Sequence, residues 1–413
     1  LANCVASVVP ARIKRLGVMA EAWLTIVGMG EDGVAGLGRR SQAALAAAEV
    51  IMAPPRHLAH VPQGAAERIA WPVPYADGIA MLASLRGRRV VVLASGDPFW
   101  FGAGSVIARS FGRDEWHALP GPSCFSLAAA ELGWALEATE CIGLHAAPFT
   151  RLRPLLAPGI RIIATLRDGD AVADLCAYLR NTGFGDSTLT ILERLGATDA
   201  DTTSATANTL TGTFTHPLVA AIEVAGTGHA LTAASGQTDD TFDHDGQITK
   251  RPVRAITLST LAPKPHQHLW DIGSGSGSIA LEWLLAHPTT QATAFETRAD
   301  RAARISANAG RLGLTHRLTV IKGDAPDTIP QAKAADAILI GGGLSQPLLD
   351  AVTATPARLV VNAVTLEGEA LLAHAHATHG GDLMRIELSQ SAPLGPKRGW
   401  ARSYPVVQWS LAR

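Results

Sequence analysis

Short apolar segments that alternate with amphipathic stretches restrict the fold of this chain more than any other feature. The alternation is most regular in the second half, where the apolar spacing changes repeatedly from strand-like to helix-like. It predicts parallel strands joined by helices, which is α/β architecture. We expect strands in this half at 268–272, 292–296, 318–321, 336–340 and 357–361, and helices at 251–261, 277–286, 300–312, 345–353 and 366–379.

Two further apolar segments, near 382–389 and 404–411, follow without a helix between them. They predict an antiparallel hairpin at the edge of the parallel sheet. The first half shows the same alternation with less regular spacing. We expect strands there at 23–28, 90–94, 161–166 and 188–193, and helices at 38–48, 103–111, 123–132 and 170–181.

A polar stretch between the halves marks the expected domain boundary. Residues 226–246 are rich in Gly, Thr, Ser and Asp and show little apolar periodicity, which is the composition of a linker. We therefore expect an N-terminal extension at 1–22, a first domain at 23–225 and a second domain at 247–413. The 413 residues suffice for both domains, at roughly 150 residues per domain.

Composition excludes several classes of protein. The 35 Lys and Arg nearly balance the 36 Asp and Glu. Binding nucleic acid through overall charge needs a positive surface, and disorder needs low hydrophobicity with high net charge, so both are excluded. The four cysteines show no C-x-x-C spacing, which argues against a zinc site and disulfides. No apolar stretch approaches the ~20 residues of a membrane span, so we expect a cytoplasmic enzyme that binds neither membrane nor metal.

The sharpest motif is a glycine-rich run, in which Gly273, Gly275 and Gly277 follow a predicted strand and precede a predicted helix. Glycines let the backbone turn tightly and approach a ligand, and the helix N-terminus adds a positive dipole. Taken alone, the run fits NAD, FAD, S-adenosylmethionine or a turn without a ligand.

Acidic residues at three consecutive strand ends narrow this choice. Asp271 stands just before the glycines, where a methyltransferase uses an acid near the sulfonium and amino-acid part of its cofactor. Glu296 ends the next strand, where an acid can bind both ribose hydroxyls. Asp324 closes the third strand, where class I methyltransferases place an acid against the adenine amino group. A nicotinamide site has no equivalent need for the third acid, so the pattern favours S-adenosylmethionine.

The second half resembles a known family over about 248–413. The matching segments are I-T-K-R-P-V-R-A at 248–255, G-D-A-P at 323–326, G-G-G at 341–343 and N-A-V at 362–364. They are similar to the decarboxylating precorrin methyltransferases of cobalamin biosynthesis. The resemblance implies a class I Rossmann-like fold and adds Ala325 and Gly341 to the cofactor-binding residues.

Three strand-end loops carry the motifs of the first half: I-V-G-M-G at 26–30, L-A-S-G-D-P at 93–98 and L-P-G-P-S at 119–123. Any one of them reads as an ordinary turn. All three in order, with E-R-L-G at 193–196, resemble the class III tetrapyrrole methyltransferases of the C5-methylating type over about 23–225. The resemblance implies S-adenosylmethionine in a cleft between two α/β subdomains, bound by Gly28, Gly30, Gly96, Asp97, Pro98, Pro122 and Ser123.

Two departures from that family concern this half. Glu31 and Asp32 stand where many relatives have Pro-Gly, and residues 144–148 replace an expected His-Gly-Arg segment. An arginine that could bind substrate is therefore missing at the second place.

Both halves together resemble the fused precorrin-6Y C5,15-methyltransferase (decarboxylating) family. The resemblance implies methylation of C5 by the first half, and methylation of C15 with loss of carbon dioxide from the ring C (C12) acetate by the second half, giving precorrin-8. It also implies one S-adenosylmethionine site per domain, S-adenosylhomocysteine as product, and a homo-oligomer, dimer or tetramer.

A substrate with many carboxylates requires cations. Candidates for positioning it are Lys250, Arg254 and Arg398, the last in an expected loop with Lys397 and Trp400. Arg298, Arg301 and Arg304 follow Glu296 and fit a solvated helix face at least as well. Glu367 is a candidate general base or a helix-capping residue. We expect His145 and the histidines at 374, 376 and 379 to lie on the surface or in packing.

The sequence alone leaves two other functions open. The second half could belong to a class I methyltransferase that acts on RNA or another small molecule, although the charge balance and the lack of an N-P-P-Y-type loop argue against RNA. A non-catalytic tetrapyrrole-binding protein is the other alternative.

Overall fold

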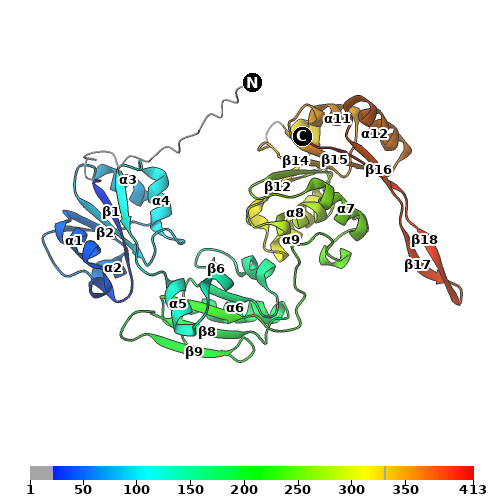
Figure 1. Cartoon of the computed structure of the whole chain (residues 1–413). Coiled ribbons are helices and arrows are strands. Elements are labelled where there is room, and N and C mark those ends of the chain that lie inside the picture. Colours follow the sequence, from blue (N-terminus) through cyan, green and yellow to red (C-terminus); the bar gives the residue numbers. More distant parts are fainter. Residues whose placement is uncertain (1–21, 330–331) are drawn as a thin grey trace, which may run out of the picture. The chain divides into compact units, whose positions relative to one another are not determined.

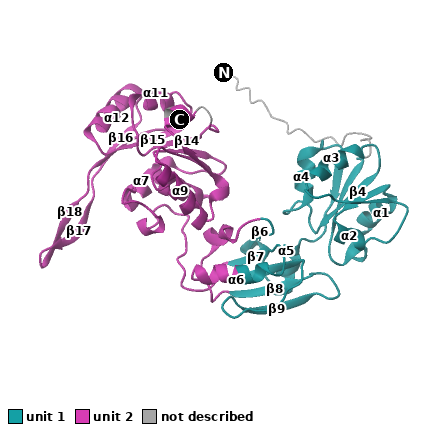
Figure 2. Cartoon of the chain, turned by 180° about the vertical axis from the view of Figure 1, so that it is seen from behind, with its two compact units in different colours: residues 1–146, 161–174, 188–223 teal, residues 147–160, 175–187, 224–413 magenta. Residues whose placement is uncertain are grey.

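The computed structural model describes residues 22–329 and 332–413 and divides into two compact units (Figures 1 and 2). Unit 1 comprises 1–146, 161–174 and 188–223, and unit 2 comprises 147–160, 175–187 and 224–413. The predicted extension lies outside the described residues, apart from its last position. No helix in the described part of the chain is long and apolar enough to cross a membrane.

The first sheet of unit 1 is parallel, with strand order β3-β2-β4-β1-β5. Its strands are β1 (Leu24–Met29), β2 (Val50–Ala53), β3 (Glu67–Ala70), β4 (Val90–Ser95) and β5 (Trp116–Leu119). The helices are α1 (Arg39–Ala47), α2 (Pro55–Ala59), α3 (Asp77–Ser84) and α4 (Ala103–Ser110), with a 3-10 turn η1 (Gly33–Gly36). Strand residues point alternately to the two faces, so β1 buries Leu24 and Ile26 in one core and Val27 and Met29 in the other.

The second sheet of unit 1 is mixed, with strand order β6-β7-β10-β8-β9. Its strands are β6 (Glu140–Gly143), β7 (Arg161–Thr165), β8 (Thr188–Glu193), β9 (Asp201–Thr206) and β10 (Leu218–Glu223). The helix α5 (Cys124–Leu132) packs on it through Phe125 and Ala128. The remaining elements in this stretch of the chain are α6 (Ala171–Asn181), η2 (Leu136–Ala138) and η3 (Phe149–Leu155).

The main sheet of unit 2 has strand order β13-β12-β11-β14-β15-β19-β16. Its parallel strands are β11 (His268–Ile272), β12 (Gln291–Glu296), β13 (Leu318–Lys322), β14 (Ala337–Ile340) and β15 (Arg358–Ala363), and its antiparallel edge is formed by β16 (Asp382–Ile386) and β19 (Val406–Leu411). The helices are α7 (Arg251–Leu261), α8 (Ser278–Ala286), α9 (Ala299–Arg311), α10 (Ala325–Thr328), α11 (Gln346–Thr353) and α12 (Leu366–His379), with the turns η4 (Asp239–Thr241) and η5 (Thr315–Arg317). This confirms the predicted α/β fold with an antiparallel edge.

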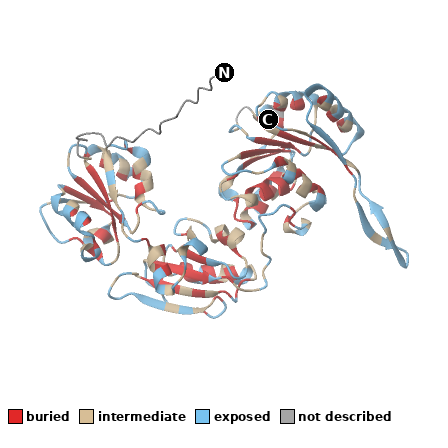
Figure 3. Ribbon diagram, in the orientation of Figure 1, coloured by how far each residue is buried: buried red, intermediate tan, exposed pale blue. Residues whose placement is uncertain are grey.

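The expected loop around Lys397 is wrong. Residues between β16 and β19 form a separate two-stranded sheet, β17 (Ser389–Leu394) and β18 (Lys397–Arg402). Figure 3 shows this hairpin as an exposed arm. The turn signal of Gly395 and Pro396 was visible in the sequence, but the backbone pairing on either side of it was not, because these strands bury no apolar face.

Arg254 is fully buried, which contradicts its predicted role in positioning substrate. Its Nε donates to Glu282 Oε1 at 2.5 Å and its Nη1 donates to Asp239 Oδ1 at 3.0 Å. The guanidinium carbon lies 5.1 Å from the centre of the Phe242 ring. Glu282 also accepts from the N–H of Gln237 at 3.0 Å. The arginine therefore joins α7, α8 and the preceding segment.

The predicted linker belongs to unit 2, and its second part packs against α9. Asp243 lies 3.3 Å from Arg304, and Asp245 accepts from Arg301 Nε at 2.8 Å, a hydrogen bond that lowers the pKa of Asp245. Phe242, directly before Asp243, is buried. Arg301 and Arg304 thus hold the polar segment to α9.

We expect Arg254→Ala to destabilise unit 2 by about 3–5 kcal/mol, because it leaves the Glu282 carboxylate buried without its cation. Denaturant unfolding of the full chain measures the loss. The neighbouring exposed Arg251→Ala is the matched control and should change the free energy of unfolding by less than about 0.5 kcal/mol. Equal effects of the two substitutions would contradict a structural role for Arg254.

Candidate active sites

The three glycine-containing loops of unit 1 meet at one edge of the parallel sheet. A β-carbon added at Gly28 would lie 1.8 Å from the carbonyl oxygen of Gly96 and 2.5 Å from the nitrogen of Gly121. The Gly121 N–H donates to the Gly96 carbonyl oxygen at 3.1 Å. Because β1, β4 and β5 are parallel, their carboxyl ends lie together, and glycine lets their loops touch.

A cavity of about 380 Å³ lies beside these loops, and all of its lining belongs to unit 1. Of the predicted cofactor residues, five line it: Gly30, Gly96, Asp97, Pro122 and Ser123. Gly28 has the packing role described above. Pro98 is buried, and its carbonyl oxygen accepts from the Gly104 N–H at 2.8 Å, so it shapes the turn into α4.

Polar side chains fix the shape of the loops around this cavity. Asp97 Oδ1 accepts from the Phe99 N–H at 2.8 Å and tightens the turn after β4. Ser123 caps α5, with Oγ accepting from the Ser126 N–H at 3.0 Å. Local hydrogen bonds therefore hold two of the loops that we predicted to bind cofactor.

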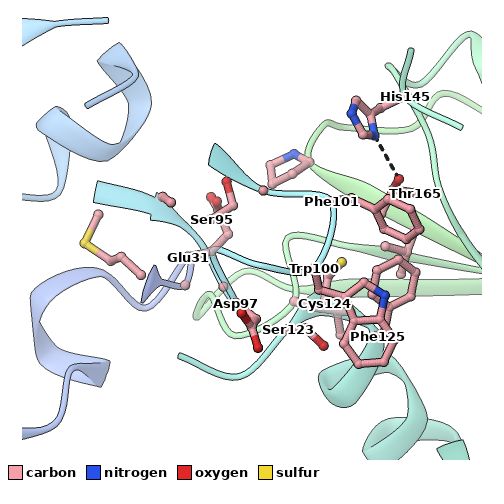
Figure 4. A pocket seen from close by; sticks show the side chains of 18 of the residues that line it. Glu31, Ser95, Asp97, Trp100, Phe101, Ser123, Cys124, Phe125, His145 and Thr165 are labelled. Atoms are coloured by element: carbon pink, nitrogen blue, oxygen red, sulfur yellow. Dashed lines mark hydrogen bonds between the residues drawn. The ribbon is translucent and has the colours of Figure 1, made fainter. Parts of the chain in front are cut away.

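Sequence reasoning missed several lining residues. His145 is exposed, as predicted, but it also lines the cavity, with Nδ1 3.2 Å from Thr165 Oγ1. Trp100 and Phe101 also line it, beside Phe125 (Figure 4). They lie just after the L-A-S-G-D-P motif at 93–98 that carried the resemblance, so a signal was present beside them in the sequence. Arg56 lines it too and carried no motif signal.

The glycine run of unit 2 makes the tight turn that its sequence predicts. Gly273, Gly275 and Gly277 have φ values of +69°, +62° and +79°, which side chains rarely adopt. A β-carbon at Gly273 would lie 2.6 Å from the carbonyl oxygen of Gly342. The Gly341 N–H donates to the Ile272 carbonyl oxygen at 2.8 Å, so the ends of β11 and β14 lie against each other.

Two of the predicted acids frame this turn from buried positions. Asp271 Oδ2 accepts from Ser274 Oγ at 2.7 Å and from the Ala280 N–H at 3.1 Å. Glu296 accepts from the Gly275 N–H at 2.9 Å, so the end of β12 supports the turn after β11. Burial raises the pKa of Asp271 to about 6, with the nearby Glu296 charge acting in the same direction.

Of the other predicted residues of unit 2, Asp324, Ala325 and Glu367 follow strand ends, whereas Lys250 and Arg398 do not. Asp324 is exposed and precedes α10, whose Ala325 is buried, at the end of β13 next to β12. Glu367 is exposed in the first turn of α12, after β15. Lys250 is exposed at the start of α7, 3.9 Å from Asp239. Arg398 lies on the exposed hairpin, away from the paired strands of the main sheet.

Glycine turns stand at both sheet edges, where a ligand could approach the backbone closely. The N–H groups of Gly273, Gly275 and Gly277 donate within the chain, which fixes the turn in unit 2, and two buried acids stand beside it. Among the described residues, no group of three or more His, Cys, Asp or Glu could hold a metal ion.

We expect the stability of unit 2 to fall as Asp271 ionises. With an ordinary pKa near 3.8 and a folded-state pKa of about 6, its protonated form stabilises the fold fully below the lower value. This contribution of about 3 kcal/mol is lost as the pH rises through the higher value. Denaturant unfolding of the full chain across this range measures it. Asp271→Asn should abolish this part of the pH dependence, and an unchanged profile would contradict the assignment.

Two protein families match the two halves of the chain. Residues 23–211 match the tetrapyrrole (corrin/porphyrin) methylases, and residues 240–413 match the precorrin methyltransferase domain. A solved structure of the C-terminal domain of precorrin-6Y C5,15-methyltransferase from Rhodobacter capsulatus is 46% identical. It covers 44% of this chain and 98% of that domain, with a TM-score of 0.42.

Full-length relatives match almost the whole chain. A Sinorhizobium sp protein named precorrin-6Y C(5,15)-methyltransferase (decarboxylating) is 46% identical over 402 residues, which are 95% of this chain and 96% of that protein. A Mycobacterium tuberculosis protein of the same name is 39% identical over 398 residues, 94% of this chain and all of that protein. The chain therefore belongs to the precorrin-6Y C(5,15)-methyltransferase (decarboxylating) family and is a decarboxylating methyltransferase.

Proposed function

We propose that this chain methylates precorrin-6Y at C5 and C15 with S-adenosylmethionine and removes carbon dioxide from the ring C acetate, giving precorrin-8. The observation that carries the proposal is the pair of glycine-built strand edges, each in a segment that matches a methyltransferase family. A chain with one such edge would have one site for cofactor. Two edges of different topology support two separate methyl transfers.

The division of labour follows the two matched segments. We assign C5 methylation to a domain at 23–225, and C15 methylation with decarboxylation to a domain at 247–413. The ion pairs of Asp243 and Asp245 tie the preceding segment to the second domain.

Each domain would hold one S-adenosylmethionine. In the first domain the cavity-lining residues Gly30, Gly96, Asp97, Pro122 and Ser123 would bind it, with Gly28 and Pro98 shaping the loops. In the second domain the binding residues would be Asp271, Gly273, Gly275, Gly277, Glu296, Asp324, Ala325 and Gly341. The buried Asp271 carboxylate suits a positively charged tail, because an unpaired buried charge favours an opposite one.

The protein has a limited chemical task in this reaction. The sulfonium of S-adenosylmethionine supplies an activated methyl group, and the reduced ring supplies a nucleophilic carbon. What remains for the chain is to hold the two in line and exclude water. Glu367, exposed beside the end of β15, is our candidate for taking up a proton in the second domain, and Lys250 and Arg398 are candidates for positioning carboxylates.

We expect two aspartate substitutions in the full chain to split the reaction. Asp97→Ala should block one methylation and spare the decarboxylation, because Asp97 lines the cavity of the first domain and decarboxylation is assigned to the second. Asp271→Ala should block the other methylation and the decarboxylation. Mass spectrometry of products from precorrin-6Y and S-adenosylmethionine measures both effects.

The wild-type product should carry two added methyl groups and lack one carbon dioxide. An unchanged substrate mass would favour a non-catalytic tetrapyrrole-binding protein. A product of Asp97→Ala with both methyl groups would overturn the division between the domains. Arg88→Gln is the control for nonspecific damage. Arg88 forms an exposed ion pair in the first domain and does not line the cavity.

We further propose that the chain works in the cytoplasm as a homo-oligomer that uses the β17–β18 hairpin. Leu394 and Trp400 on this hairpin are 68% and 77% exposed, and the hairpin strands pair only with each other in the described chain. Exposed apolar side chains on a projecting arm are typical of a contact between subunits.

Light scattering of the full chain should therefore give the mass of a dimer or tetramer. The double substitution Leu394→Ser and Trp400→Ser should lower that mass, because it removes the apolar contact. Met81→Ser, which changes an exposed apolar residue of α3, should leave the mass unchanged. A monomeric wild-type chain would contradict the proposal.

A further inference from the structure

Arg56 is the one arginine among the described residues that line the cavity of unit 1, and no lysine lines it. It lies on α2, outside all of the loops that carry the family motifs. A tetrapyrrole with several carboxylates needs a cation in this cavity, and the arginine expected near residues 144–148 is absent from the sequence.

Two cavity-lining residues hold the Arg56 guanidinium in place. Nη1 donates to Glu31 Oε1 at 2.5 Å, and Nη2 donates to Ser95 Oγ at 2.5 Å. Glu31 follows the first glycine loop and Ser95 ends β4, just before Gly96. The arginine is thus anchored to both loops, while its side chain keeps 35% of its surface exposed.

Arg56 is the cation of this part of the cavity, because burial keeps the two neighbouring imidazoles neutral. The buried His57 ring lies 3.0 Å from Ser95 Oγ, and burial lowers its pKa to about 4, with Arg56 acting in the same direction. Burial and then Arg56 also lower the pKa of His216, another lining residue. Both imidazoles are therefore neutral near pH 7, and the guanidinium stays charged.

Aromatic rings lie across the cavity from this anchored group. Figure 4 shows Glu31 and Ser95 on one side and Trp100, Phe101 and Phe125 on the other. Trp100 and Phe101 are 40% and 54% exposed, although each packs on Phe125. Phe101 has a φ of +56°, a strained conformation for an aromatic residue that is found most often at functional positions.

We propose that Arg56 binds a side-chain carboxylate of the tetrapyrrole in this cavity, while the ring of the substrate lies against Trp100 and Phe101. A guanidinium pairs with a carboxylate through two parallel hydrogen bonds, and an exposed aromatic face suits a flat macrocycle. Glu31 orients the arginine before substrate binds. The proposal rests on the proposed function, in which the first domain methylates C5.

The test is the kinetics of C5 methylation by the full chain. Arg56→Gln should raise the KM for precorrin-6Y by roughly ten- to a hundredfold, because a charge-assisted hydrogen bond is lost. Arg56→Lys keeps the charge without the paired geometry and should give an intermediate KM. The dissociation constant of S-adenosylmethionine, and the C15 methylation and decarboxylation, should stay at wild-type values in both variants.

Glu31→Gln separates substrate binding from a merely structural ion pair. It breaks the same pair but keeps the cation, so its KM should rise less than that of Arg56→Gln. Equal effects of the two substitutions would assign Arg56 a structural role and overturn the proposal. Arg88→Gln, which breaks the exposed pair with Glu67, is the matched control and should match the wild type.

The wild-type result separates a failure of the proposed function from a failure of the role of Arg56. If the wild-type chain forms no C5-methylated product, the proposed function fails. If it forms that product and Arg56→Gln keeps the wild-type KM, the function stands and the role of Arg56 is refuted. A rise in the dissociation constant of S-adenosylmethionine equal to the rise in KM would also refute it.

Discussion

Backbone packing at the carboxyl edge of each parallel sheet is the constraint on which both candidate sites depend. Gly28 and Gly96 bring two loops together in unit 1, and Gly273 and Gly342 do the same in unit 2. A side chain at Gly28 or Gly273 would occupy space already filled by backbone atoms. Since parallel strands end at a common edge, this contact gathers residues from distant parts of the chain and leaves no side chain between their backbones.

Charge is used differently in the two units. In unit 2 the arginines of α7 and α9 bind the acidic residues of the preceding segment, as in the pairs of Arg254 with Asp239 and Arg301 with Asp245. A polar run and a group of cations that looked separate in the sequence are partners. In unit 1 Arg56 pairs with Glu31 at the edge of a cavity, where it remains partly exposed. Burial decides which arginine stabilises the fold and which can meet a ligand.

The strength of the local signal explains which elements were predictable. The helix at 251–261 and the strand at 268–272 were predicted with their observed bounds, because apolar spacing, a leading Pro252 and flanking polar residues agree there. The strand β9, with the sequence DTTSAT, has no apolar face and exists through its pairing with β8. The strands β2 and β3 are only four residues long, too short for a periodic signal.

By itself the sequence determined the α/β class, the order of the glycine loops, the acids at three strand ends and the resemblance of each half to a methyltransferase family. These features are local, because each depends on residues within one turn or one element. Only the tertiary structure decided that Arg254 is buried, that His145 and Arg56 line a cavity, and that residues 397–402 form a strand. Those outcomes depend on which distant residues fill the space around a side chain, and the spacing along one chain carries no record of that.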